Sequence, residues 1–374
     1  MSGTRRRFLR GMVVGAGAAA AVAGSTAVGR PAAQRLVSFG ARPQPAARTA
    51  DPFVSLRHGP QVRDPYWGAD LLPWWKGQLH THTARSFDGD PNVPPVRRAA
   101  LYQLAGYDFV VLTDHDRVSA LPGSGLVEPA GGAERPVLII PGVESTDPSA
   151  HLGVWFMGQD AAPAAVDPPL VASRRAAGER IEAWAAMGAL VCCNHPSHPS
   201  APLSPEQVAS WAGAGLPFRF VEVFNTLATR SAEGLAHNLE VWRRALTAAG
   251  PERPVWAVAT DDSHQPAVGQ SWIAVAAPSL SAGALREALL AGRFYASNGP
   301  DFRALGVDEE AGAIVASAPG ATTIRFVGDD GATRRQVAGE TGWYRPQRGD
   351  RWVRVEAVDG AGRMAWSQPF WLDA

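Results

Sequence analysis

Short apolar runs recur along the middle of the chain and are mostly separated by segments with a helical period. A short apolar run is typical of a buried strand, and apolar residues three or four positions apart are typical of a helix packed on one face. The expected strands are residues 76–79, 109–112, 137–140, 152–157, 189–193, 220–224 and 255–259, and the clearest expected helices are 95–105, 173–187 and 232–249. This alternation predicts an α/β fold whose largely parallel sheet is covered by helices and is either open or closed into a barrel.

The pattern changes after residue 300, where the helical period ends. Short alternating runs at 322–327 and 352–358, separated by Gly-containing turns such as Asp329-Asp330-Gly331, are typical of antiparallel strands. We therefore expect an α/β domain over residues 74–300 and a small antiparallel β domain, similar to a β-sandwich, over residues 301–374. The Ser297-Asn298-Gly299-Pro300 segment is the expected hinge.

The N-terminus has the pattern of an export signal. Thr4-Arg5-Arg6-Arg7-Phe8-Leu9-Arg10 precedes a mildly apolar Gly/Ala/Val stretch over residues 11–24, which is the arrangement of a twin-arginine signal peptide. We assign residues 1–33 to this signal and 34–73 to a linker and entry segment. The expected location is outside the cytoplasm, as a secreted, periplasmic or cell-wall protein, with the twin-arginine machinery as a partner and no stable membrane anchor after cleavage.

Charge and cysteine content narrow the function. The chain has 374 residues with 35 basic and 35 acidic side chains, so it carries no bulk positive charge that would attract nucleic acid. Its only two cysteines, Cys192 and Cys193, are adjacent in an apolar run and are expected to pack in the core. We therefore expect no nucleic-acid partner, no disulfide and no thiolate metal site.

Histidine and carboxylate side chains follow one expected strand after another. His80-Thr81-His82 comes directly after the first strand, and Asp262-Ser263-His264 comes directly after the last. In a barrel-like α/β fold the loops after the strands meet at one rim, so these side chains are expected to face one pocket. The nine candidate ligands are His80, His82, Asp88, His115, Glu144, His151, His195, Asp262 and His264.

This donor set predicts a metal centre. Imidazole and carboxylate ligands without thiolates suit Zn, Mn or Fe, and a carboxylate such as that of Glu144 can bridge two ions. Clustered divalent ions lower the pKa of bound water and stabilise both the attacking and the leaving oxygen of a displacement. We therefore expect clustered divalent ions as cofactors.

The motifs resemble those of the PHP (polymerase and histidinol phosphatase) superfamily of metal-dependent phosphoesterases, over about residues 74–300. Within it the chain is most similar to the exported CehA/McbA-type branch, which includes a carbamate hydrolase. The segments that carry the resemblance are Gly77-Gln78-Leu79-His80-Thr81-His82-Thr83, Leu112-Thr113-Asp114-His115-Asp116, Pro141-Gly142-Val143-Glu144, Asn194-His195-Pro196, Val221-Glu222-Val223-Phe224-Asn225 and Asp262-Ser263-His264.

The resemblance implies a distorted (β/α)7 barrel with a trinuclear site. By similarity, His80, His82, Glu144 and Asp262 hold the first ion, Glu144, His151 and His195 the second, and Asp88, His115 and His264 the third. Asp88 follows His82 by one residue more than in compact family members, and a site with two ions is the alternative. We expect His80, His82, Glu144, Asp262 and His264 to carry the catalysis.

Several residues outside this set have two interpretations. His198 either contacts substrate or lies in a solvated loop, and Asn225 either donates to a substrate oxygen or forms a turn. Asp114 is expected to accept a hydrogen bond from a ligand imidazole. His58 and His237 are assigned to structure, and Trp67, Trp74 and Trp75 to core packing in preference to an aromatic wall.

The expected function is an exported hydrolase that uses a metal-bridging hydroxide on a small-molecule phosphate ester, without a protein nucleophile. A carbamate or carboxylic ester hydrolase on the same site is one alternative. A non-catalytic, metal-stabilised extracytoplasmic binding protein is another.

Overall fold

The computed structural model describes residues 53–56, 60–119, 125–129, 131–155, 176–229 and 231–373, and the statements below concern these ranges. The expected signal over residues 1–33, most of the expected linker, and His58 lie outside them. The helices are α1 (Pro95–Leu104), α3 (Ala177–Ala186), α4 (Pro205–Gly213), α5 (Ala232–Ala249), α6 (Ala282–Leu290) and the short 3-10 helix η1 (Ala69–Leu71). None of the described helices is both long and apolar enough to cross a membrane.

The α/β part contains a continuous row of paired strands. Its members are β3 (Trp74–Gln78), β4 (Phe109–Leu112), β5 (Leu126–Val127), β6 (Val137–Asp147), β7 (Ala150–Trp155), β8 (Leu190–Cys193), β9 (Phe220–Asn225), β10 (Trp256–Thr260), β11 (Trp272–Ala276) and β12 (Phe294–Ser297). The row runs β12-β11-β3-β4-β6-β7-β8-β9-β10. The short strand β5 pairs with the first residues of β6. The expected α/β class is confirmed.

The strand directions differ from a repeated parallel barrel. The β3–β4, β4–β6, β8–β9 and β9–β10 pairs are parallel, whereas β7 is antiparallel to both β6 and β8. The reason is local: Asp147 accepts hydrogen bonds from the Ser149 N–H and hydroxyl, which closes a tight turn and sends the chain straight back as β7. Within the described residues no ladder pairs β10 with β3, β11 or β12, and only the isolated bridge between Thr81 and Ser263 joins the two sides, so no ladder closes the row into a ring.

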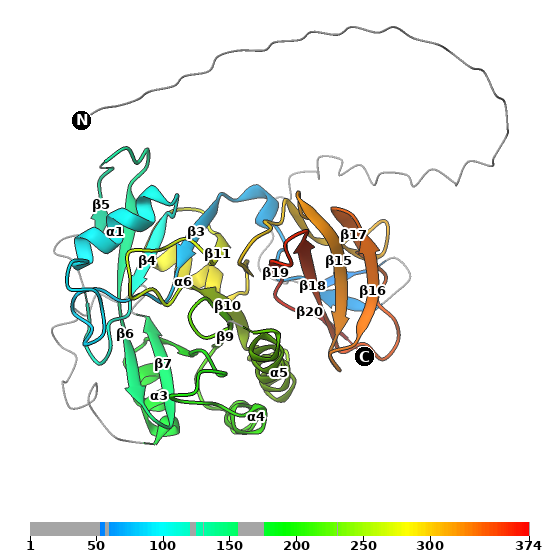
Figure 1. The fold of residues 1–374 in the computed structure, drawn as a ribbon. Coiled ribbons are helices and arrows are strands. Elements are labelled where there is room, and N and C mark those ends of the chain that lie inside the picture. Colours follow the sequence, from blue (N-terminus) through cyan, green and yellow to red (C-terminus); the bar gives the residue numbers. More distant parts are fainter. Residues whose placement is uncertain are drawn as a thin grey trace, which may run out of the picture. The chain divides into compact units, whose positions relative to one another are not determined.

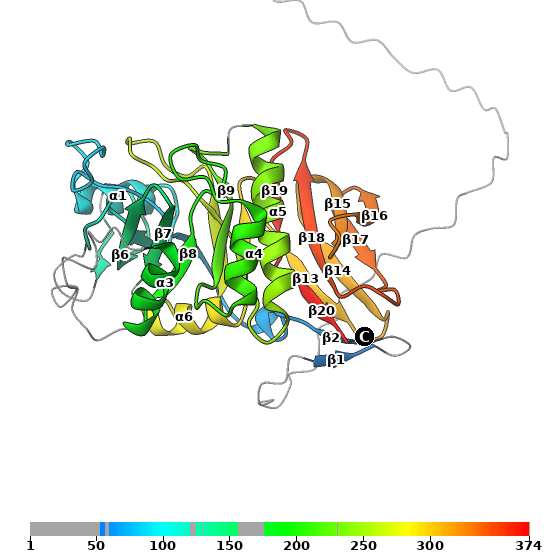
Figure 2. The same ribbon diagram turned by 90° about the horizontal axis from the view of Figure 1, so that it is seen from below.

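Helices cover the outside of this row (Figure 1), and α4 lies beside α5 in both views (Figures 1 and 2). Helix α5 coincides with its expected range because both ends carry strong signals. The Ser231 hydroxyl accepts from the Gly234 N–H at the start, and Gly250 ends the helix at a φ of 76°. Its buried face includes Val241, Trp242 and Ala245.

Antiparallel strands make up the C-terminal part, drawn in orange and red in Figure 1. They are β13 (Ala304–Asp308), β14 (Ala313–Ser317), β15 (Ala321–Gly328), β16 (Thr333–Ala338), β17 (Thr341–Tyr344), β18 (Trp352–Asp359), β19 (Met364–Trp366) and β20 (Phe370–Leu372). Strands β13, β14 and β17 form a separate three-stranded sheet, and β15 pairs with β16 and β18.

The C-terminal strands are joined to the α/β strands by pairing as well as by packing. Strand β19 pairs with β12, and β20 pairs with β2 (Gln61–Arg63), which is paired with β1 (Phe53–Ser55). The Gln368 side chain hydrogen-bonds both backbone groups of Ala257 in β10. The boundary at residues 300 and 301 stays a prediction, and the described part of the expected linker contributes ordered strands.

Candidate metal centre

Most of the nine predicted ligands follow the ends of the strands β3, β4, β8 and β10, whereas Glu144 lies within β6 and His151 at the start of β7. Neighbouring strand ends are tied together there, since Asp262 N–H donates to His80 O and His82 N–H donates to Ser263 O, each at 3.0 Å. Seven of the nine line a cavity of about 560 Å³, and His80 and His82 are buried beneath it. The structure thus brings all nine together, although they come from positions up to 184 residues apart, from 80 to 264.

Four ligand atoms form the innermost group. His80 Nε2 lies 3.1 Å from His82 Nε2, 3.3 Å from Asp262 Oδ1 and 3.4 Å from Glu144 Oε2. His82 Nε2 lies 3.0 Å from Asp262 Oδ1 and 3.5 Å from Glu144 Oε2. A tetrahedral ion with ligand bonds of about 2.1 Å places its ligand atoms about 3.4 Å apart. The five separations are close to this value, and His80, His82 and Glu144 together form a group that could hold one ion.

The charges of the group also fit a cation. Glu144, Asp262 and the neighbouring Glu222 are buried carboxylates, and within the described residues their only ion-pair partners are histidines. Glu144 Oε2 has no hydrogen-bond partner in this part of the chain. Buried carboxylates without Lys or Arg partners are stable only when protons or metal ions neutralise them.

The pKa values reflect this excess of negative charge. Burial alone would lower the pKa of His80, but the nearby carboxylates of Asp262, Glu144 and Glu222 raise it well above its usual value. Burial lowers the pKa of His82 to about 4, with the charge of His264 acting in the same direction. The raised pKa of His80 thus reflects the same negative charge that would attract a cation.

A second group shares Glu144 with the first. Glu144 Oε1 lies 3.0 Å from His195 Nε2 and 3.4 Å from His151 Nδ1. Asn194 Nδ2 donates to the same oxygen at 3.0 Å and so orients the carboxylate. Because the two oxygens of Glu144 face different groups, this residue is placed as a bridge between two ion positions.

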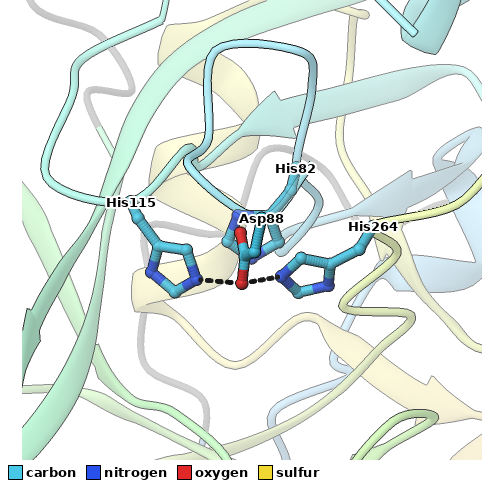
Figure 3. A group of neighbouring side chains, drawn as sticks. All are labelled: His82, Asp88, His115 and His264. Carbon is cyan, nitrogen blue, oxygen red and sulfur yellow. Dashed lines mark ion pairs between the residues drawn. The ribbon is translucent and has the colours of Figure 1, made fainter. Parts of the chain in front are cut away.

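The third group consists of Asp88, His115 and His264, which Figure 3 draws together with His82. The Asp88 Oδ2 atom is 3.3 Å from His115 Nε2 and 3.1 Å from His264 Nε2, between the two imidazoles. Figure 3 also shows His82, whose ring stacks on that of His264 with centroids 4.0 Å apart. The Asp88 side chain is 39% exposed, so this group opens to solvent while the first two are buried.

Glu222 is the supporting residue that the sequence analysis did not assign. Its carboxylate accepts four hydrogen bonds, from His80 Nδ1, the Thr260 hydroxyl, the His195 N–H and Asn225 Nδ2, at 2.7, 2.7, 2.7 and 2.9 Å. The bond to His80 places the proton on Nδ1 and leaves the lone pair on Nε2, which faces the ligand group. A charged residue inside the apolar run Phe220-Val221-Glu222-Val223-Phe224 was the available signal, since a buried acid requires partners.

The backbone is strained at this centre. Among the described non-glycine residues, positive φ angles occur only at Asp116 (48°), His195 (25°) and Asp262 (49°). Two of these are predicted ligands, and hydrogen bonds from their N–H groups hold them, His195 to Glu222 and Asp262 to His80. Each such conformation costs about 1–3 kcal/mol, which is typical of functional sites.

The structure contradicts the expected role of Asp114 and shows which of its two expected roles Asn225 has. Asp114 accepts from the Thr83 N–H and hydroxyl and from the Ser119 hydroxyl, not from an imidazole, because it points toward the loop after β3. Asn225 forms a turn: its Oδ1 accepts from the N–H groups of the next residues, and its Nδ2 donates to Glu222 and Asp262.

The remaining assignments concern His198, His237 and the tryptophans. His198 lies on the cavity wall, with its Nδ1 2.6 Å from Ser200 Oγ. His237 contacts the Leu203 carbonyl oxygen from helix α5, away from the cavity. Among Trp67, Trp74 and Trp75 none lines the cavity. Trp67 and Trp75 pack against the core as expected, whereas Trp74 is 37% exposed with its ring beside that of Tyr295.

No protein-family model and no curated protein matches this chain. Solved structures that are similar include a two-domain protein containing a predicted PHP-like metal-dependent phosphoesterase from Bacteroides vulgatus, 18% identical, with 82% of this chain and 95% of that chain covered and a TM-score of 0.40. Another is the lesion-specific endonuclease PfuEndoQ from Pyrococcus furiosus, 14% identical, covering 59% and 56% of the two chains, with a TM-score of 0.40. At these identities and TM-scores the likeness supports no conclusion about the function of this chain.

Proposed function

We propose that this protein is a metal-dependent hydrolase that cleaves phosphate esters of small molecules. The observation that carries the proposal is the innermost group, in which the Nε2 atoms of buried His80 and His82 lie 3.1 Å from each other and 3.0–3.5 Å from Asp262 Oδ1 and Glu144 Oε2. A purely structural cluster of acids and imidazoles would gain nothing from this spacing. The motifs that resemble the PHP superfamily and its exported CehA/McbA-type branch support the same assignment.

We assign the ligands in three groups. His80, His82, Glu144 and Asp262 hold the first ion, Glu144, His151 and His195 the second, and Asp88, His115 and His264 the third. Zn, Mn and Fe all suit these donors. When bound, such ions neutralise a phosphate and acidify a water molecule.

The residues of the chain prepare this centre in advance. Glu222 and Ser86 hold the Nδ1 atoms of His80 and His82, so that both Nε2 lone pairs face the first group. The partly exposed Asp88 is the part of the centre nearest to solvent, where an incoming ester arrives.

His198 is suited to contact the substrate. Its Nδ1 accepts the Ser200 N–H at 3.3 Å, so the neutral ring carries its proton on Nε2. From the cavity wall this Nε2–H donates to an oxygen of the ester, which steadies the substrate beside the second group.

The test is a metal and activity measurement on the purified protein. Mass spectrometry is expected to give two or three divalent ions per chain, and aryl phosphate mono- and diesters are expected to be cleaved until a chelator is added. Less than one ion per chain together with no chelator-sensitive turnover would refute the proposal. Parallel rates on a naphthyl carbamate and a carboxylic ester separate phosphoesterase activity from the alternative hydrolases.

A non-catalytic binding protein is the alternative from another class. The cavity argues against ions that only stabilise the fold, because seven of the ligands line it and the Asp88 side chain is 39% exposed. A folded, metal-loaded protein that cleaves none of these esters would favour the binding protein.

We also propose that the protein is exported by the twin-arginine route. The motif at residues 4–10 and the apolar stretch at 11–24 support this. The route carries folded proteins, so the metal centre would assemble before export.

A further inference from the structure

Phe87 is a large apolar residue that is exposed to solvent. Its side chain is 80% exposed, more than any other exposed large hydrophobic residue of the described chain. An exposed phenyl ring forgoes the stabilisation that burial would bring, and a single exposed ring needs no explanation on an ordinary surface. This ring, however, lines the cavity above the metal centre.

The loop that carries Phe87 is fixed on both sides by the centre. On one side the Ser86 hydroxyl bonds His82 Nδ1 at 2.8 Å and accepts the His115 N–H at 2.9 Å. On the other side Asp88 lies between His115 and His264 (Figure 3). The Phe87 ring itself stacks on His115, with centroids 4.7 Å apart and planes inclined by 24°. One face of the phenyl ring is thus covered by the imidazole ring of His115.

The rest of the cavity wall is apolar or uncharged beyond the ligands. Pro148 and Leu227 line the same cavity, together with Thr146, Ser200 and the half-buried His198. No Lys or Arg is among its described lining residues. A second charged group on the substrate would therefore find no side-chain partner here, whereas a flat apolar group would find a ring and two apolar side chains.

We propose that Phe87 determines substrate specificity by packing against an uncharged aromatic ring of the ester, next to the bond that is cleaved. The substrate class is then an aryl ester whose only charge lies on the scissile group. This inference rests on the proposed function for its reaction, but the binding preference is independent of turnover.

The test uses two phosphonates that are not cleaved, phenylphosphonate and methylphosphonate, and measures their affinity for the metal-loaded protein by calorimetry. Aromatic contacts of this kind predict that phenylphosphonate binds about five- to tenfold more tightly. The preference is expected to fall to about twofold or less in Phe87→Ala and Phe87→Leu, and to persist in Phe87→Trp. Phe87→Leu keeps apolar bulk in the loop, and unchanged affinity for methylphosphonate in each variant shows that the ion site is intact.

Equal affinities for the two phosphonates in the natural protein, or a preference that survives Phe87→Leu, would overturn the inference. Cleavage of phenyl phosphate is measured separately. If phenyl phosphate is cleaved but the phosphonates bind equally, only the role of Phe87 is lost. If phenylphosphonate is preferred and no ester is cleaved, the ring subsite stands and the phosphoesterase function falls.

Discussion

Replacing Glu222 by Gln tests whether the inner ligands are held by this residue. The carboxylate accepts four hydrogen bonds and donates none, and Gln keeps its shape but replaces one oxygen with an NH₂ donor. If the NH₂ group of the new Gln side chain faces the His195 N–H and the Asn225 Nδ2, it meets two other donors and no acceptor. Each donor left without a partner then lowers the stability of the fold by about 1–3 kcal/mol. If the NH₂ group faces His80, the Nδ1 atom must accept, and the proton moves to Nε2, the atom that points at the first ion position.

Either orientation weakens the centre, so we expect Glu222→Gln to bind metal about 10–100-fold more weakly, as is usual when the partner of a ligand histidine is lost. That range corresponds to about 1.4–2.7 kcal/mol. Competition with a chelator of known affinity measures the loss, and circular dichroism confirms that the variant is folded. The matched control is Glu240→Gln, the same change at a partly exposed acid on α5 that pairs with Arg243 and Arg244. A folded Glu222→Gln protein with unchanged metal affinity would refute the assignment of Glu222.

Other predictions concern the ligand group, a buried arginine and the export signal. His82→Ala is expected to lose the first ion and at least about 100-fold of any ester turnover while the fold persists, with His237→Ala as the unaffected control; equal metal content in the two variants would contradict this. Arg98→Leu is expected to lower the free energy of unfolding by about 2–5 kcal/mol in urea titrations, because buried Arg98 donates to His82 O and Gln265 O, whereas exposed Arg97→Leu should cost less than about 1 kcal/mol. Equal unfolding energies of these two variants would contradict the role of Arg98. Replacing both residues of Arg5-Arg6 by Lys is expected to retain the precursor in the cytoplasm, and unchanged export in cell fractionation would rule out the twin-arginine route.

Local patterns predicted the elements that carry strong end signals or continuous apolar runs. The expected strand 109–112 coincides with β4, because its continuous apolar run predicts a strand that is buried on both faces. The expected helix 232–249 coincides with α5, because the capping residues stand directly beside its two ends in the sequence. Helices α4 and α6 were not among the clearest predictions, since each is short. The reversal at β7 was not predicted either: a two-residue turn held by Asp147 overrode the expectation of a crossover helix.

The candidate site likewise has features that the residue pattern predicts and features that depend on tertiary contacts. The residue pattern predicted which side chains gather at the site, because most of the candidate His and acids follow an apolar run, and in an α/β fold the ends of such strands meet. Only the tertiary structure decided which atoms face one another. The short separations around His80 Nε2, the two-sided use of Glu144, the support from Glu222 and the exposed ring of Phe87 over His115 all depend on contacts between segments far apart in the chain. Such contacts follow from packing and side-chain orientation, which no local pattern of residues specifies.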